Sequence, residues 1–196
     1  LTLWLHAMGA KATGYALPAP TEPSLFEAAR LAEMIDHHEG DVRDCGALCE
    51  LVERARPEVI FHLAAQPLVR LSYAEPVETY ATNVMGTVHV LEAARRAGGV
   101  RAIVCVTSDK CYENREWVWP YRESDPMGGH DPYSSSKGCA EIVAAAWRRS
   151  YFMDGGSALA TVRAGKVIGG GDWAQDRPVP DLVRAFEEGL APLIRS

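Results

Sequence analysis

Two continuous apolar runs constrain the fold of this chain more than any other feature. Residues 59–65 (VIFHLAA) and residues 102–107 (AIVCVT) are each long enough for one strand and show little alternation of polar and apolar side chains. Such runs are typical of parallel strands that are covered on both faces. A helical stretch at residues 76–97 separates them, and another at residues 132–152 leads to a third strand at residues 158–163. The sequence therefore predicts an α/β fold with a doubly wound parallel sheet and right-handed crossovers.

The first quarter of the chain continues this alternation of strands and helices. We expect a helix over residues 1–9, a strand over residues 11–17 and a helix with a serine cap over residues 24–31. Residues 39–42 are typical of a strand end, and residues 44–55 of a helix. In doubly wound sheets ligands bind beyond the carboxyl ends of the strands, so residues that follow strands are the candidates for chemistry.

Charge and composition argue against nucleic acid and membrane as partners. The net charge is -6, and the 20 Lys and Arg are interspersed with 26 Asp and Glu rather than gathered in a basic stripe. No apolar run approaches the roughly 20 residues that a membrane-spanning helix needs. Five cysteines without a C-x-x-C pair favour a reducing compartment, with the cytoplasm as the default. The six histidines show no metal-ligand spacing, so we expect no metal site.

A tyrosine and a lysine one helical turn apart give the strongest chemical signal. Tyr133 and Lys137 open the helix expected over residues 132–152 and, at i and i+4, share one face of it. The ammonium group can then favour the ionised phenol, so the tyrosine can act as an acid or base toward a substrate hydroxyl. A surface tyrosine near a surface lysine would show the same spacing. The pair therefore indicates an active site only if other residues support it.

That support comes from the sequence TSDK at residues 107–110, directly after the second apolar run. In a doubly wound sheet, Ser108, Asp109 and Lys110 would lie at the crevice that Tyr133 reaches from the next helix. A solvated turn is the better explanation of this segment alone. Joined to the tyrosine and lysine pair, the segment predicts an active site.

Five motifs follow one another in the order seen in extended short-chain dehydrogenases. They are HLAAQ (62–66), TNVMGT (82–87), TSDK (107–110), PYSSSK (132–137) and VRAGKVIG (162–169). Within that class the chain resembles the nucleotide-sugar epimerases and dehydratases, and most of all the CDP-glucose 4,6-dehydratases. This finer resemblance is carried by QPLVRLS (66–72), SDKCYENREWVW (108–119) and GGGDW (169–173). The similarity covers essentially the whole chain.

The resemblance implies a 4,6-dehydration of a nucleotide sugar, with CDP-glucose as the expected substrate and CDP-4-dehydro-6-deoxyglucose as the product. Tyr133, helped by Lys137, would take the proton of the sugar 4-hydroxyl while hydride leaves C4 for the nicotinamide. Ser108 would hydrogen-bond the same oxygen. Asp109 would protonate the departing 6-hydroxyl, with Lys110 as the base at C5 or as the electrostatic partner of Asp109. Hydride would then return to C6, so the cofactor is recycled internally.

The resemblance also implies where the dinucleotide binds, with the end of the strand at residues 39–42 facing adenine. The expected cofactor-binding residues are Asp41, Val42, Ala64, Ala65, Gln66, Thr107, Tyr133, Lys137 and Arg163. For Ala64 and Ala65, simple core packing is an equally good explanation. NAD is favoured by the family. NADP stays open, because residues 15–18 (YALP) lack the acidic residue that NAD enzymes of this fold often place after the second strand.

The resemblance implies a substrate-binding set and a partial domain. The expected substrate-binding residues are Arg70, Lys166, Asp172, Trp173 and Arg177, of which Lys166 stands where the family usually has Asn. We interpret residues 1–196 as a partial NAD(P)-binding Rossmann-like domain in which residues 166–196 begin the substrate-binding part. The Gly-rich pyrophosphate loop of the family would precede this stretch and the rest of the substrate domain would follow it. We therefore expect the chain alone to bind dinucleotide poorly and to have little activity.

Two alternatives remain open at this point. A sugar-nucleotide 4-epimerase uses the same tyrosine and lysine pair but does not need Asp109 and Lys110 for an elimination. A non-catalytic dinucleotide-binding protein would keep the fold without the chemistry. The resemblance also implies a homodimer, which would form through the helices expected over residues 76–97 and 131–152.

Overall fold

The computed structural model describes residues 1–153 and 155–192. The chain divides into two compact units, one made of residues 1–39 with residues 166–196 and the other of residues 40–165. The end of the expected substrate-binding part, residues 193–196, lies outside the described residues. Each unit is described by itself.

The unit of residues 40–165 is built on a three-stranded parallel sheet in the order β3-β4-β5. Its strands are β3 (Val59–His62), β4 (Ala102–Ser108) and β5 (Ala158–Ala164). The expected parallel arrangement of these strands is confirmed, because both β3 and β5 run parallel to the central β4. The sheet packs its apolar side chains against helices, and the shared core is formed by Leu91, Val100, Ile103, Cys105, Ala144 and Leu159.

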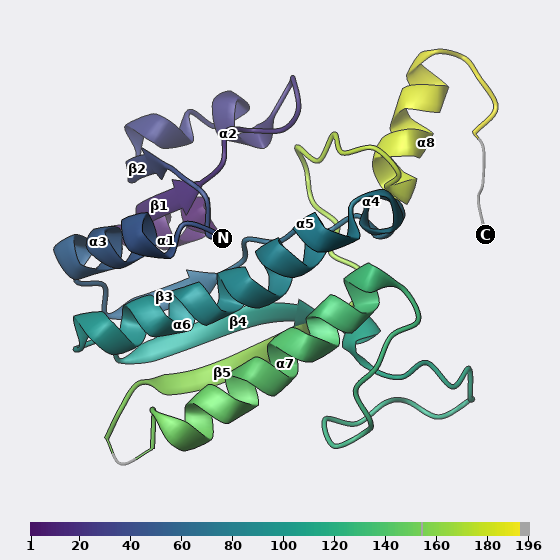
Figure 1. Ribbon diagram of the computed structural model, residues 1–196. Helices are drawn as coiled ribbons and strands as arrows, with labels where there is room; N and C mark the ends of the chain where they lie inside the picture. The colour runs from purple at the N-terminus through teal and green to yellow at the C-terminus, as the bar shows by residue number, and fades with distance from the viewer. Residues whose placement is uncertain (154, 193–196) are drawn as a thin grey trace. The chain divides into compact units, whose positions relative to one another are not determined.

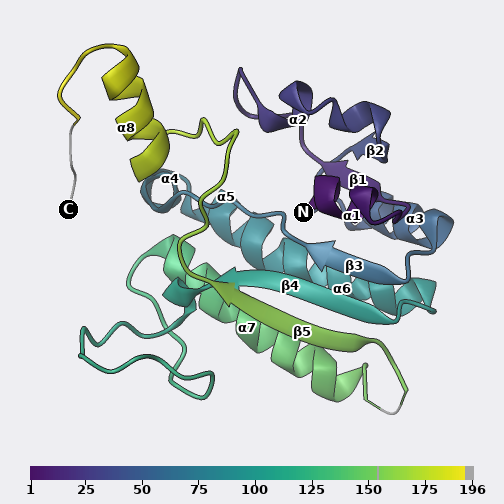
Figure 2. The ribbon, with the colours of Figure 1, turned by 180° about the vertical axis from the view of Figure 1, so that it is seen from behind.

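Helices cover one face of this sheet in the described residues of the unit (Figures 1 and 2). Helices α6 (Gly86–Ala97) and α7 (Pro132–Ser150) lie in front of the strands in one view and behind them in the other. The expectation that the first apolar run is covered on both faces is therefore wrong for this part of the chain. On β3, Val59 is 45% exposed and Phe61 is 39% exposed.

The first apolar run also leaves the sheet earlier than expected. Strand β3 ends at His62, and residues 63–68 have no regular structure. The backbone amide of Gln66 donates a hydrogen bond to the side chain of Asn83 at 2.8 Å. A side chain therefore supplies the partner that a neighbouring strand would otherwise give, and the segment that follows β3 is held as a loop.

The helical stretch expected over residues 76–97 is confirmed, and it contains one change of winding. It consists of α5 (Pro76–Tyr80), a π-helical turn (Ala81–Met85) and α6 (Gly86–Ala97). Such π turns are rare and occur often at functional sites. This one carries Asn83, and Thr87 donates a hydrogen bond back to the Asn83 carbonyl at 2.7 Å. The π-helical turn therefore contains the residue that holds the loop after β3.

The unit also contains α3 (Cys45–Ala55) and α4 (Val69–Ala74), besides the helices that cover the sheet. Helix α3 is capped by Asp44, whose side chain accepts a hydrogen bond from the backbone of Ala47, and it packs against α6. The short helix α4 follows the loop after β3. Helix α7 is expected to within two residues by its sequence pattern, and Pro132 occupies its first turn, where proline is favoured.

The unit of residues 1–39 with residues 166–196 contains a parallel pair of strands, β1 (Thr13–Ala16) and β2 (Asp36–Glu39). It also contains α1 (Thr2–Ala7), α2 (Leu25–Ala28) and α8 (Pro178–Glu187). Ser24 caps α2 as expected, by accepting a hydrogen bond from the backbone of Glu27. The helix expected over residues 24–31 ends early because Arg30 adopts a left-handed backbone conformation, with φ of 51°.

No helix in the described part of the chain combines the length and apolar character that crossing a membrane requires.

Candidate active site

The segment expected to carry acid and base chemistry forms a short turn at the carboxyl end of β4. Ser108 ends the strand, and a 3-10 turn (Asp109–Cys111) follows it. The Ser108 hydroxyl donates to the Asp109 carboxylate at 3.0 Å and accepts from the backbone amide of Lys110 at 3.2 Å. Ser108 is buried, whereas Asp109 and Lys110 are exposed. The turn therefore presents a carboxylate and an ammonium group to solvent beside a fixed hydroxyl.

The tyrosine and lysine of the second expected element lie in the first two turns of α7. Asp131 caps this helix by accepting a hydrogen bond from the backbone of Ser134 at 2.9 Å. Tyr133 is 9% exposed and Lys137 is 6% exposed. Burial lowers the pKa of Lys137, because removal from water disfavours its charged form.

Helix α7 packs closely against the end of β4 and the turn that follows it. The Lys137 ammonium donates a hydrogen bond to the carbonyl of Val106, two residues before Ser108, at 3.5 Å. Gly138 lies beside the turn, and a side chain there would meet the Cys111 carbonyl at 3.3 Å from its first carbon. The absence of a side chain at Gly138 therefore lets the turn after β4 pack on α7. The structure thus brings together the segments of Ser108, Asp109 and Lys110 and of Tyr133 and Lys137.

Asn83 connects this helix with the loop after β3. Its side-chain amide donates to the Gln66 carbonyl at 3.1 Å and to the Ser136 hydroxyl at 2.9 Å, while its oxygen accepts from the Gln66 amide. Ser136 in turn donates to the carbonyl of Tyr133 at 2.7 Å. Asn83 and Ser136 were not among the expected site residues. The signal for Asn83 was its place in the TNVMGT motif, which the sequence reasoning used only for the resemblance.

A buried histidine lies close to the lysine. His62, at the end of β3, shares a hydrogen bond with the Thr87 hydroxyl at 3.0 Å. Burial, together with the charge of Lys137, lowers the pKa of His62 to about 4. The ring is therefore neutral near pH 7.

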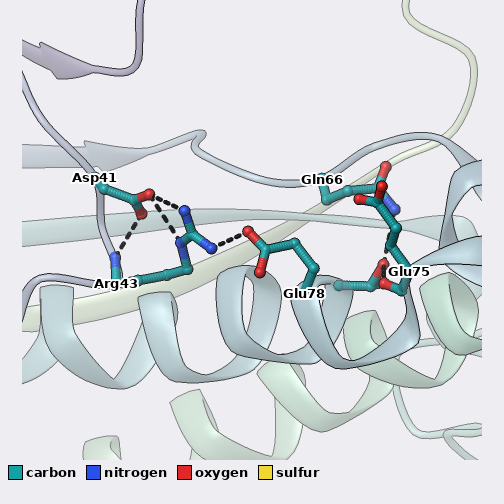
Figure 3. A network of polar contacts seen from close by, with 6 residues as sticks. Asp41, Arg43, Gln66, Glu75 and Glu78 are labelled. Atoms are coloured by element: carbon teal, nitrogen blue, oxygen red, sulfur yellow. Dashed lines mark hydrogen bonds and ion pairs between the residues drawn. The ribbon is translucent and has the colours of Figure 1, made fainter.

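Asp41 and Val42, expected near adenine, follow β2 and lie beside α5 and α6. Asp41 is bound to Arg43, which also contacts Glu78 on α5 (Figure 3). The hydrogen bond from Arg43 lowers the pKa of Asp41. Val42 is buried, and its carbonyl shares a hydrogen bond with the His89 ring at 2.8 Å.

The remaining expected cofactor residues lie after β3 and on β4 and β5. Ala64, Ala65 and Gln66 are half-buried in the loop between β3 and α4, and the side-chain amide of Gln66 donates to the Thr79 hydroxyl at 2.9 Å. Thr107 and Arg163 both hydrogen-bond to the carboxylate of Glu141.

The expected substrate-binding residues are divided between the two units. Arg70 is exposed on α4 in the unit of residues 40–165. The other four belong to the unit that contains α8. There Asp172 accepts a hydrogen bond from the backbone of Ala174 at 3.0 Å, and the Trp173 carbonyl accepts one from Arg184 at 2.9 Å.

Lys166 and Arg177 are the other two substrate candidates in the unit that contains α8. Lys166 is exposed, and Arg177 has a buried Nε without a hydrogen-bond partner among the described residues. Within residues 1–153 and 155–192, no three His, Cys, Asp or Glu side chains gather as a metal site would require.

Comparison with known proteins identifies the family. A sequence model described as GDP-mannose 4,6 dehydratase matches residues 22–161. A CDP-glucose 4,6-dehydratase from Salmonella typhimurium is 58% identical over 100% of this chain, and the chain spans 56% of that relative's length. The resemblance stated from the motifs is therefore confirmed.

Solved structures agree with the fold. The chain is similar to a dTDP-glucose 4,6-dehydratase from Streptomyces venezuelae, solved with NAD bound, with a TM-score of 0.81 and 25% identity over 96% of this chain and 58% of that one. A UDP-glucose 4-epimerase from Thermotoga maritima gives a TM-score of 0.86 at 22% identity, over 98% of this chain and 60% of that one, and so shares the fold. The match over residues 22–161 covers most of the chain, which belongs to the GDP-mannose 4,6-dehydratase family.

Proposed function

We propose that the chain is the catalytic part of a nucleotide-sugar 4,6-dehydratase that converts CDP-glucose to CDP-4-dehydro-6-deoxyglucose with NAD. The observation that carries this proposal is the packing of the Tyr133 and Lys137 helix against the end of β4. The Lys137 ammonium bonds to the carbonyl of Val106, and the turn that begins after Ser108 packs on the same helix. The choice of CDP-glucose is supported by the relative from Salmonella typhimurium.

The residues of this unit fit a dinucleotide. An ammonium group carries three donor protons, and the bond to Val106 uses one of those of Lys137, so others can reach the hydroxyls of a ribose. The Asp41 carboxylate, which accepts hydrogen bonds from Arg43, is of the chemical type that can accept a hydrogen bond from an exocyclic amine. When bound, NAD would supply the hydride-accepting and hydride-returning chemistry that oxidation at C4 and reduction at C6 require. The NAD-bound relative supports NAD as the cofactor.

The first chemical task is oxidation at C4, and the first side chains of α7 serve it. Tyr133 takes the proton of the 4-hydroxyl, with the ammonium of Lys137 favouring the phenolate. Ser108 would donate its one hydroxyl proton to the same sugar oxygen in place of the Asp109 carboxylate, while the backbone amide of Lys110 holds the hydroxyl oxygen. The product of this step is a 4-ketone.

The second task is loss of water across C5 and C6. The 4-ketone acidifies the C5 hydrogen, so the bond to it breaks as a base takes the proton and the electron pair expels the 6-hydroxyl. Asp109, in its protonated form, gives a proton to the departing hydroxyl, which leaves as water, and Lys110, in its neutral amine form, takes the C5 proton. Both side chains lie in one 3-10 turn and are exposed on it, so they can reach adjacent carbons of one sugar.

The proposal is tested on the complete protein that contains this chain. The protein is incubated with CDP-, dTDP-, UDP- and GDP-glucose, and the products are identified by NMR. We expect a 4-keto-6-deoxy sugar from CDP-glucose without any added redox partner. An Asp109→Asn variant should lose this product while it still oxidises C4.

Three outcomes would contradict the proposal. Unchanged turnover of Asp109→Asn would exclude its role in elimination. A CDP-hexose inverted at C4 would identify an epimerase. Dinucleotide binding without any sugar product would identify a non-catalytic protein.

A further inference from the structure

Glu141 is a buried acidic residue that the proposed mechanism does not use. It lies on α7 one helical turn beyond Lys137 and two turns beyond Tyr133, so the three side chains share one row of the helix. Exposed acidic residues are common on helices, but buried ones are rare unless they are paired. The buried carboxylate of Glu141 therefore needs hydrogen-bond donors or a charged partner, and its burial calls for a functional explanation.

Its carboxylate has three donors, and all come from the sheet. The hydroxyl of Thr161 on β5 donates at 2.9 Å, and so does one guanidinium nitrogen of Arg163 on the same strand. The third donor is the hydroxyl of Thr107 on β4. Thr107 is the residue directly before Ser108, so Glu141 fixes the strand end at the point where the catalytic turn begins.

Arg163 contacts the other end of the same turn. Its second guanidinium nitrogen donates to the Tyr112 hydroxyl at 2.7 Å and to the Glu123 carbonyl at 3.0 Å. The guanidinium also lies over the ring of Tyr112, 4.9 Å from its centre. Tyr112 directly follows the turn (Asp109–Cys111). The Glu141 and Arg163 ion pair therefore holds the residue before Ser108 and the residue after Cys111 at once.

We propose that this ion pair is a positioning unit that sets Ser108, Asp109 and Lys110 against the tyrosine and lysine of α7. Neither member touches the reacting atoms, and the inference rests on the dehydratase function proposed above. The guanidinium of Arg163, expected from the sequence to contact the cofactor, instead contacts Glu141, Tyr112 and Glu123 in this structure.

Stability alone does not account for such a pair. Buried ion pairs can often be replaced by apolar side chains of similar volume without loss of stability. An apolar pair would lose the control of orientation between the strand end and the turn. The three donors to Glu141, and the two other acceptors of Arg163, fix the orientation of these segments as well as their distance. Errors of about 1 Å in the placement of catalytic groups can cost roughly 100-fold in rate.

The test uses three variants of the complete protein and one control. Glu141→Gln removes the charge from the pair. The double variant Glu141→Leu/Arg163→Met replaces the pair by apolar side chains of similar length. Tyr112→Phe removes one hydroxyl that Arg163 contacts. The control is the double variant Glu92→Gln/Arg95→Gln, which removes a more exposed ion pair on α6.

The readouts are thermal unfolding and the kcat and KM for CDP-glucose. We expect Glu141→Gln to lower kcat by about 100-fold with KM within about twofold. The apolar double variant should regain the thermal stability of the wild type and keep the low kcat. Tyr112→Phe should fold and lower kcat several-fold, and the control should match the wild type in every readout.

Two results separate this inference from the proposed function. If the wild-type protein makes no 4-keto-6-deoxy product, the proposed function fails. If the wild type is active and the apolar double variant recovers kcat together with stability, the ion pair is structural and the positioning role is refuted. If neither variant of the ion pair folds, a Tyr112→Phe protein with wild-type kcat refutes the positioning role.

Discussion

Replacement of Asn83 by alanine should destabilise the protein and loosen the loop after β3. The side chain is buried in the π-helical turn and joins the backbone of Gln66 to the Ser136 hydroxyl. Alanine leaves the Gln66 amide and carbonyl and the Ser136 hydroxyl without these partners. No other residue of the turn offers the two donors and the acceptor that one side-chain amide supplies.

The size of the effect follows from the number of bonds. Asn83 makes three hydrogen bonds through its side chain, to the two backbone groups of Gln66 and to Ser136. Each contributes about 1 kcal/mol to stability, and a buried group left unpaired costs about 1–3 kcal/mol. Asn83→Ala should therefore lower the free energy of unfolding by about 3 kcal/mol or more.

Urea unfolding of the complete protein, followed by circular dichroism, measures this change, and Asn114 provides a matched control. Asn114 is an exposed asparagine in the loop after β4, and Asn114→Ala should change the free energy of unfolding by less than about 0.5 kcal/mol. The reasoning is refuted if the two variants unfold at the same urea concentration. It is also refuted if Asn83→Ala loses stability while its affinity for NAD is unchanged, because the loop of Gln66 is expected to bind the dinucleotide.

Three further perturbations have outcomes that the structure predicts. Tyr133→Phe should lower kcat by about 10²–10⁴-fold with little change in substrate binding, as measured by steady-state kinetics and calorimetry, because it removes the proposed base; wild-type kcat would contradict this role. The pKa of His62, about 4 in the folded protein, lies below its ordinary value of 6.5, so the stability it contributes is fully present above about pH 6.5 and is lost as the pH falls toward 4. The slope is at most about 1.4 kcal/mol per pH unit, and urea unfolding of His62→Gln should show a flatter dependence over this range than the wild type; equal slopes would show that another group titrates. Ile142 is 61% exposed on α7, and Ile142→Glu should dissociate the expected homodimer in analytical ultracentrifugation, whereas Val118→Glu in an exposed loop should not; a wild-type monomer would refute the dimer itself.

The sequence predicts those elements whose local pattern and tertiary role agree. Strand β4 and helix α7 lie where the apolar run and the helical stretch predict them. The position of Asp109 and Lys110 directly after β4 also follows from pattern alone, because a buried parallel strand must be followed by residues that leave the sheet. These elements carry the proposed catalytic residues.

Local pattern fails where a distant side chain replaces a regular backbone partner. The run at residues 59–65 is apolar except for His62, yet its last part is a loop, and directly after it Asn83 binds the backbone of Gln66. The same side chain lies in a π turn within the helix expected over residues 76–97, and the local pattern does not predict this change of winding. No local propensity shows an interaction between residues 17 positions apart.

Buried polar partners were missed for a related reason. Glu141 is part of a helix with many polar positions, and its sequence neighbours give no sign that it faces Thr107, Thr161 and Arg163. The available signal was its spacing of one turn from Lys137, which places both on one helix face. That face could be assigned to the sheet only once the strands were in place.

The most direct test of the account follows one hydrogen atom through the reaction. The complete protein is given CDP-glucose that carries deuterium at C4, in ordinary water, and the product is examined by NMR and mass spectrometry. The account predicts a 4-keto-6-deoxy product with the deuterium at C6 and a solvent hydrogen at C5. A product without deuterium at C6, or unchanged CDP-glucose, would contradict it.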